Sequence, residues 1–253
     1  ELLPNLHLLL QGEQKQSFSF GYQLALSACD LDLLIESSFE KMLLVDQANP
    51  RFILGMYSGI FEQSYEVWQK HNDKLLGDER LVYLYPEFIR TGKIQKSHLE
   101  ILLDLIRSGD LPPNSANALS YGSVTDGIAH DVIADFCLKL SDLGGRASWS
   151  ALNVIYMYCF SKKGSVDSLR DSLKKLVSTV PLHKDQKNTV TDAHHWHDLA
   201  EKLLMEPDED FAVALTNQLI AACQYGLNHS DIWSYIKPLL LDLMRTYSDV
   251  LWP

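Results

Sequence analysis

Apolar residues recur three and four positions apart along most of this chain, which is the spacing of one face of a helix. No stretch alternates between apolar and polar residues for long enough to predict a strand. Roughly a dozen helical segments joined by short loops account for the whole sequence. We therefore expect an all-α fold, as stacked antiparallel helical hairpins in an α-solenoid or as a multi-helix bundle, forming one helical-repeat domain over residues 1–253.

A repeated helix end lies between residues 81 and 119. Residues 88–94, Phe-Ile-Arg-Thr-Gly-Lys-Ile, are echoed by residues 105–111, Leu-Ile-Arg-Ser-Gly-Asp-Leu, after a shift of about 17 residues, one helix and one turn. The arginine suits the negative end of a helix dipole, and the glycine can adopt the left-handed conformation that ends a helix. We expect both Gly92 and Gly109 to do so, which favours stacked helices.

Three other segments predict particular helices. Asn49 and Pro50 are typical of a helix start, and the apolar spacing predicts one long helix over residues 50–76. Residues 126–143 carry one apolar stripe and stop at Gly144-Gly145. The following segment, residues 147–160, is apolar nearly all round, so we expect it to lie between layers of other helices.

Composition limits the classes of function. The chain has 253 residues, of which 46% are hydrophobic, enough for a continuous core. Its formal charge of -11 weighs against general binding to nucleic acid, whose phosphates require positive surface. No apolar run approaches the roughly 20 residues of a membrane helix, and no signal peptide is evident. We expect no membrane association.

The cysteines predict the redox compartment of the protein, and the first residue predicts whether the chain is a fragment. Cys29, Cys137, Cys159 and Cys223 are far apart and lie in apolar helical segments, which favours reduced, buried thiols and a cytoplasmic protein. The sequence begins with Glu1 instead of Met, and it is already helical in character at Leu2. We expect the chain to be a fragment of a longer protein.

A histidine-rich run, residues 192–198, is the sharpest chemical feature. If Trp196 points to the core, His194, His197 and Asp198 share the opposite helix face with Glu201. Imidazoles at i and i+3 can share a metal ion. A solvated helix face is the alternative interpretation, so these residues are weak metal candidates.

Two His-Asp dipeptides, His130-Asp131 and His197-Asp198, occur in a helical context. They resemble a fragment of the HD phosphohydrolase pattern, whose family binds metal through a histidine, a His-Asp pair and a later aspartate. The resemblance implies His71 or His98 as the early histidine and Asp231 as the late aspartate. This pattern gives the alternative function, an all-α metal-dependent phosphohydrolase.

One local concentration of positive charge provides a further candidate surface. It covers an expected outer helix and its flanking loops: Lys162, Lys163, Arg170, Lys174, Lys175, Lys184 and Lys187. An acidic partner or nucleic acid could use it, but the aromatic residues that single-stranded nucleic acid requires are not interleaved there. A solvated face is the simpler interpretation.

The helix-turn-helix spacing with glycine stops resembles HEAT-type α-solenoids. The run of residues 138–160, in which Leu143-Gly144-Gly145-Arg146-Ala147 precedes the apolar helix, is similar to the helical C-terminal regions of large bacterial NTPases, including antiviral defence proteins. The likeness covers residues 81–180. It implies a scaffold or sensor surface without catalysis, and it identifies no functional residues.

These observations favour a non-catalytic helical scaffold or sensor module. It would bind another protein, or another domain of the parent chain, through a helical face, and it would need no cofactor.

Overall fold

The computed structural model describes residues 2–11, 15–27, 30–161, 166–182, 190–225 and 230–251. Within these ranges all regular structure is helical and no strand occurs, so the predicted all-α class is confirmed. The helices pack into two compact units, Glu1–Ile94 and Gln95–Pro253. Each unit has a core of its own, and the single continuous domain expected from the sequence stays a prediction.

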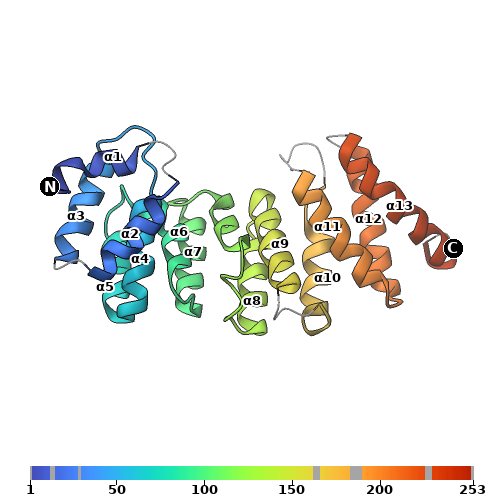
Figure 1. Ribbon diagram of the computed structural model, residues 1–253. Helices are drawn as coiled ribbons and strands as arrows, with labels where there is room; N and C mark the ends of the chain where they lie inside the picture. Colours follow the sequence, from blue (N-terminus) through green and yellow to red (C-terminus); the bar gives the residue numbers. More distant parts are fainter. Residues whose placement is uncertain are drawn as a thin grey trace. The chain divides into compact units, whose positions relative to one another are not determined.

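Short and medium helices build the first unit (Figure 1). They are η1 (Leu3–Asn5), α1 (Leu6–Leu10), α2 (Ser17–Ser27), α3 (Leu31–Met42), α4 (Arg51–Gln63), α5 (Tyr65–Leu76), η2 (Val82–Leu84), α6 (Tyr85–Phe88) and η3 (Ile89–Thr91). Helix α4 packs against α1, α2, α3, α5 and α6, so it forms the centre of this unit. Its core holds the buried aromatic residues Phe52, Tyr57, Trp68, Tyr85 and Phe88.

Helices α2 and α4 approach each other so closely that glycine is required at the contact. A Cβ atom on Gly55 would lie 2.0 Å from the backbone oxygen of Phe18, and one on Gly21 would lie 2.1 Å from that of Phe52. Both distances are far below van der Waals contact. The Gly55-x-x-x-Gly59 spacing is visible in the sequence and is the signal that could have revealed this contact.

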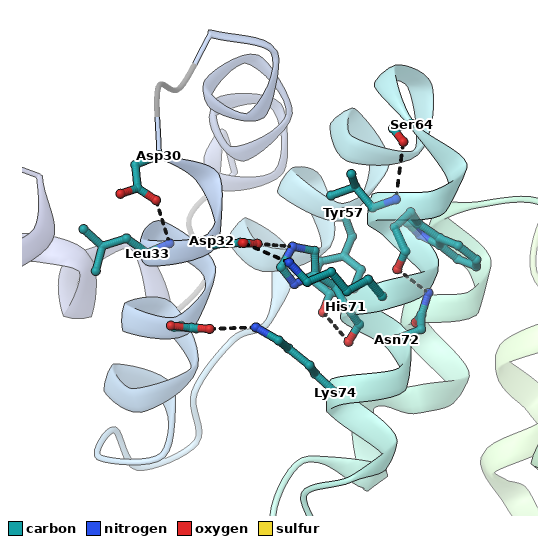
Figure 2. Close-up of polar contacts among 12 residues, drawn as sticks. Asp30, Asp32, Leu33, Tyr57, Ser64, His71, Asn72 and Lys74 are labelled. Atoms are coloured by element: carbon teal, nitrogen blue, oxygen red, sulfur yellow. Dashed lines mark hydrogen bonds and ion pairs between the residues drawn. The ribbon is translucent and has the colours of Figure 1, made fainter.

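The single helix expected over residues 50–76 is wrong, because the chain breaks at Ser64. Ser64 has extended dihedral angles (φ -158°, ψ 113°), and its hydroxyl accepts a hydrogen bond from the Val67 amide at 3.3 Å (Figure 2). It therefore acts as the N-cap of α5. The break turns α5 back onto α4 and creates a helical hairpin where the apolar spacing predicted one rod.

The two repeated glycines have different roles. Gly109 follows α7 with φ +90°, the left-handed end that was predicted, and the Leu111 amide bonds back to the Leu105 carbonyl at 3.0 Å. Gly92 is extended instead (φ -127°, ψ -159°), so the prediction for it is wrong. A Cβ atom there would lie 2.6 Å from the Trp68 ring, so Gly92 provides space for an aromatic side chain.

The second unit consists of α7 (Lys96–Ser108), η4 (Pro113–Ser120), α8 (His130–Ser141), α9 (Gly145–Phe160), η5 (Asp167–Leu169), α10 (Arg170–Thr179), α11 (Val190–Leu204), α12 (Glu209–Tyr225), α13 (Ser230–Thr246) and α14 (Ser248–Leu251) (Figure 1). Each helix packs on helices one or two places away in the chain, such as α8 on α9, α9 on α11 and α11 on α13. Both the α-solenoid and the multi-helix bundle stay predictions for the arrangement of these helices.

Helix α9 is the most buried helix of this unit, as its composition predicted. Every residue from position 147 to position 155 is buried, and α9 contacts η4, α8, α10 and α11. Gly144, with φ +74°, makes the turn that separates α8 from α9. Because α9 lies among several helices, any polar residue on it needs a partner within the protein.

Candidate functional site

The histidine-rich helix α11 is oriented by Trp196, which is buried as expected and donates a hydrogen bond from Nε1 to the Val177 carbonyl at 3.0 Å. His194 is exposed, while His197 and Asp198 are half-buried. No group of three or more His, Cys, Asp and Glu side chains within the described ranges is placed to hold a metal ion.

The predicted metal candidates have other neighbours. The rings of His194 and His197 lie beside Tyr235 of α13, with centroid separations of 6.1 and 5.5 Å. Asp198 accepts a hydrogen bond from Lys202 Nζ at 3.2 Å, one helical turn away. These contacts hold α11 to α13 and neutralise the carboxylate, so they give the helix a packing role.

His195, which the sequence analysis did not select, lies at the centre of a buried polar network. Its Nδ1 is 2.7 Å from Asn153 Oδ1 on α9, and its ring stacks on Tyr156 with centroids 3.8 Å apart. Asn153 donates its amide hydrogen to Asp192 at 2.7 Å, so its oxygen faces the imidazole. His195 therefore carries its proton on Nδ1.

The network ends in an ion pair. Asp192 is completely buried, and its Oδ2 lies 2.5 Å from Nη1 of Arg146, which is partly exposed. Burial, together with adjacent His194, lowers the pKa of His195 to about 4, against the opposing attraction of Asp192 and Asp198. An efficient general base has a pKa near neutral pH. His195 is neutral there and weakly basic, which suits a structural link between α9 and α11.

The histidines of the HD pattern have separate neighbours. His130 begins α8, and its Nδ1 is 2.9 Å from the hydroxyl of Tyr158 on α9, while Asp131 is exposed. His98 is buried and accepts the Gln95 amide hydrogen at Nδ1, 3.1 Å away. The side chain of Asp231 lies outside the described residues. Within the part of the chain that the structure describes, this pattern forms no assembled metal centre.

The basic set is partly neutralised. Arg170 Nη2 lies 2.8 Å from Glu206, and its Nη1 donates to the Leu203 carbonyl at the end of α11, 3.1 Å away. Lys174 is ion-paired with Asp208. Lys175 is exposed. Lys162, Lys163, Lys184 and Lys187 lie outside the described residues. Arg170 and Lys174 thus join α10 to the segment between α11 and α12.

In the first unit, a polar seam joins α3 to α5 (Figure 2). His71 is buried, and its Nε2 lies 3.0 Å from Asp32 Oδ1, while Lys74 bonds Glu36 at 2.8 Å. The Tyr57 hydroxyl donates to the His71 carbonyl at 3.2 Å. Burial lowers the pKa of His71, although Asp32 opposes this. A cleft of about 250 Å³ beside the seam has an apolar floor and both signs of charge at its rim.

A second apolar hollow lies between α11 and α13, within the second unit. It has a volume of about 260 Å³, and its apolar lining is Leu204, Met205, Leu239, Leu243 and Tyr247. Glu201 and Asp242 stand at its edges. Met205, which directly follows α11 and lines this hollow, is 79% exposed.

An acidic hollow of about 650 Å³ adjoins the apolar one, since Thr246 and Tyr247 line both. Its carboxylates are Asp208, Glu209, Asp210 and Asp249. The Tyr247 hydroxyl accepts the Asp208 amide hydrogen at 3.1 Å, so Tyr247 fixes the boundary between the two hollows. We call the combined feature the α11–α13 groove. Its described lining combines apolar side chains in one hollow with carboxylates in the other.

Sequence reasoning did not find this groove. The acidic run at residues 206–210 can be seen in the sequence, but such a run is also typical of a helix start. Asp208 does cap α12, because its carboxylate accepts the Phe211 amide hydrogen at 2.9 Å. Leu239 and Leu243 follow a helical spacing that predicts only burial. No family model, curated protein or solved structure matches this chain.

Proposed function

We propose that this chain is a non-catalytic helical module that binds another protein, or another domain of its parent chain, through the α11–α13 groove. The observation that carries the proposal is Met205, a large apolar side chain that is 79% exposed above an apolar hollow. Burying apolar surface of this kind drives protein association. A HEAT-like organisation and a relationship to the helical regions of bacterial NTPases are part of the proposal.

The polar networks support a structural scaffold. The buried groups with unusual environments, Asp192 and His195, bond to neighbouring helices and line neither hollow of the groove. Cys137 and Cys159 are buried free thiols, which fits a cytoplasmic setting. Cys223 is exposed, so the predicted burial is wrong for this cysteine. None of the described helices has the length and apolar content needed to cross a bilayer.

A site-specific photo-crosslinker tests the proposal. The photoreactive residue replaces Met205 in the full chain, expressed in its native cells, and a matched control replaces Leu44, which is also 79% exposed but lies in the first unit. We expect one dominant crosslinked protein from position 205, with the crosslink mapped to the groove by mass spectrometry. Its affinity for the purified chain should fall at least tenfold with Met205→Ser.

Two results would contradict the proposal. One is the absence of any adduct at position 205 above the level at position 44. The other is a crosslinked protein that binds the Met205→Ser variant as tightly as the unchanged chain.

A further inference from the structure

We propose that the partner segment in the α11–α13 groove is a basic peptide carrying one or two apolar anchor residues. This inference rests on the proposed function and adds the chemistry of the partner. It follows from the way that the two hollows meet at Tyr247, with apolar lining on one side and carboxylates on the other. A ligand that fills both needs apolar and cationic groups close together.

The apolar half provides the anchor site. Leu239, Leu243 and Tyr247 are buried and form the floor, while Leu204 is half-buried and Met205 stands exposed at the edge. The volume of about 260 Å³ suits a small number of aliphatic side chains. Methionine adapts its shape to different anchors, which is common at peptide-binding surfaces.

The carboxylates of the groove favour a partner segment with positive charge. The two hollows are edged by six carboxylates: Glu201, Asp208, Glu209, Asp210, Asp242 and Asp249. No described lysine or arginine lines either hollow. Lys174 neutralises Asp208, and Arg245 lies 3.7 Å from Asp242. The remaining four carboxylates form no ion pair with a described residue, so the groove is strongly negative.

This charge argues against the other occupants. A second copy of the chain, with a formal charge of -11, would be repelled electrostatically. Nucleic acid would be repelled for the same reason, because its phosphates would face carboxylates. A lysine- or arginine-rich segment would gain electrostatic attraction outside the anchors, which increases the rate of association and makes it depend on salt.

The test uses three synthetic fluorescent peptides of about 15 residues, long enough for about four turns of helix. The first has two leucines within a lysine-rich sequence, the second replaces the lysines with glutamate, and the third replaces the leucines with serine. Fluorescence anisotropy with the full chain measures binding at low and high salt. We expect the first peptide to bind at least tenfold more tightly than either of the others and to weaken at high salt.

Matched variants of the chain locate the binding. Met205→Ser, and separately the double variant Glu201→Gln with Asp249→Asn, should each weaken the first peptide at least fivefold. Leu44→Ser and Asp171→Asn are the controls, since Leu44 has the same exposure as Met205 and Asp171 is an exposed carboxylate of the second unit that forms no ion pair with a described residue. The controls should leave binding unchanged. Circular dichroism checks that every variant is folded.

The possible failures are distinguishable. Equal or tighter binding of the glutamate peptide, or equal effects of groove and control variants, would overturn the basic-peptide inference. The proposed function survives that result if crosslinking at Met205 identifies a partner without a basic segment. Absence of both peptide binding and a crosslink would remove the inference and the proposed function together.

Discussion

Arg146 of α9 and Asp192 of α11 form an ion pair in which Nη1 lies 2.5 Å from Oδ2 and the carboxylate is completely buried. The same carboxylate accepts a hydrogen bond from Asn153, which in turn bonds His195. One buried charge therefore orients two residues of α9 and one of α11. This connection helps to position α11, whose last residue, Leu204, is followed by Met205 at the edge of the groove.

Removing the buried carboxylate should destabilise the chain strongly. Asp192→Ala removes the buried carboxylate that Arg146 and Asn153 both bond, and breaking a buried ion pair costs about 3 to 5 kcal/mol of the free energy of unfolding. Urea denaturation followed by circular dichroism measures the loss. Arg107→Ala is the control, because Arg107 pairs with Asp104 on the surface, where such pairs contribute about 1 kcal/mol or less. Equal losses for the two variants would contradict the structural role of Asp192.

His195 should make stability depend on pH. Its pKa is about 4 in the folded chain, against an ordinary value of 6.5, because burial disfavours the charged ring. The unfolded chain therefore binds the proton more readily. The contribution of His195 to the free energy of unfolding is therefore fully present above about pH 7. It decreases by up to about 3 kcal/mol as the pH falls from 6.5 to 4. Urea denaturation at several pH values measures this decrease.

The matched control for this prediction is His195→Gln. His71, whose pKa burial also lowers, contributes the same sign of pH dependence in both proteins, so the difference between them isolates His195. Nitrogen NMR should show the His195 proton on Nδ1 at neutral pH, where Asn153 Oδ1 accepts it. An imidazole that is charged at pH 6, or identical pH profiles for the two proteins, would disprove this account.

Gly55→Ala should disrupt the contact between α2 and α4. The added methyl group would lie 2.0 Å from the Phe18 backbone oxygen, so the two helices must separate. Overpacking of this kind costs about 1 to 3 kcal/mol. Gly77→Ala in the same unit is the control: its Cβ would lie 3.4 Å from the nearest backbone oxygen, and we expect a change within about 0.5 kcal/mol. Thermal unfolding of both variants measures the difference, and similar melting temperatures would contradict the close approach.

Arg170 should contribute to stability more than its neighbour Lys175 on α10. Arg170 bonds both Glu206 and the Leu203 carbonyl, and hydrogen bonds to charged groups contribute about 2 kcal/mol. Arg170→Ala should lower the free energy of unfolding by about that amount, measured by urea denaturation. Lys175→Ala, at an exposed position, should change it by less than about 0.5 kcal/mol. A larger effect at Lys175 would indicate that the basic set acts differently.

The candidate site shows how far sequence reasoning reached. The orientation of α11 was predictable, because Trp196 is large and apolar and points into the core. The role of His195 was not, because its burial depends on Asn153 of α9, 42 positions earlier in the chain. A helix pattern shows which face is polar, and it does not show whether another helix carries a matching amide.

The repeated helix ends show the same limit at the level of the backbone. Gly92 and Gly109 have nearly the same local sequence, yet only Gly109 adopts the left-handed conformation. At Gly92 the ring of Trp68 occupies the space that a Cβ atom would take. Local sequence indicated a stop at both positions, and only the tertiary structure showed that the glycine at position 92 is needed for an aromatic contact.

The sequence by itself determined the all-α class, the central burial of α9 and the inward face of α11, because these depend on apolar spacing within one helix. Only the tertiary structure decided the hairpin at Ser64, the Asp192–Asn153–His195 network and the α11–α13 groove. Each of these features requires residues from separate segments to lie within a few ångströms of one another. Those distances depend on how whole helices pack, and the spacing of apolar residues along one helix does not specify them.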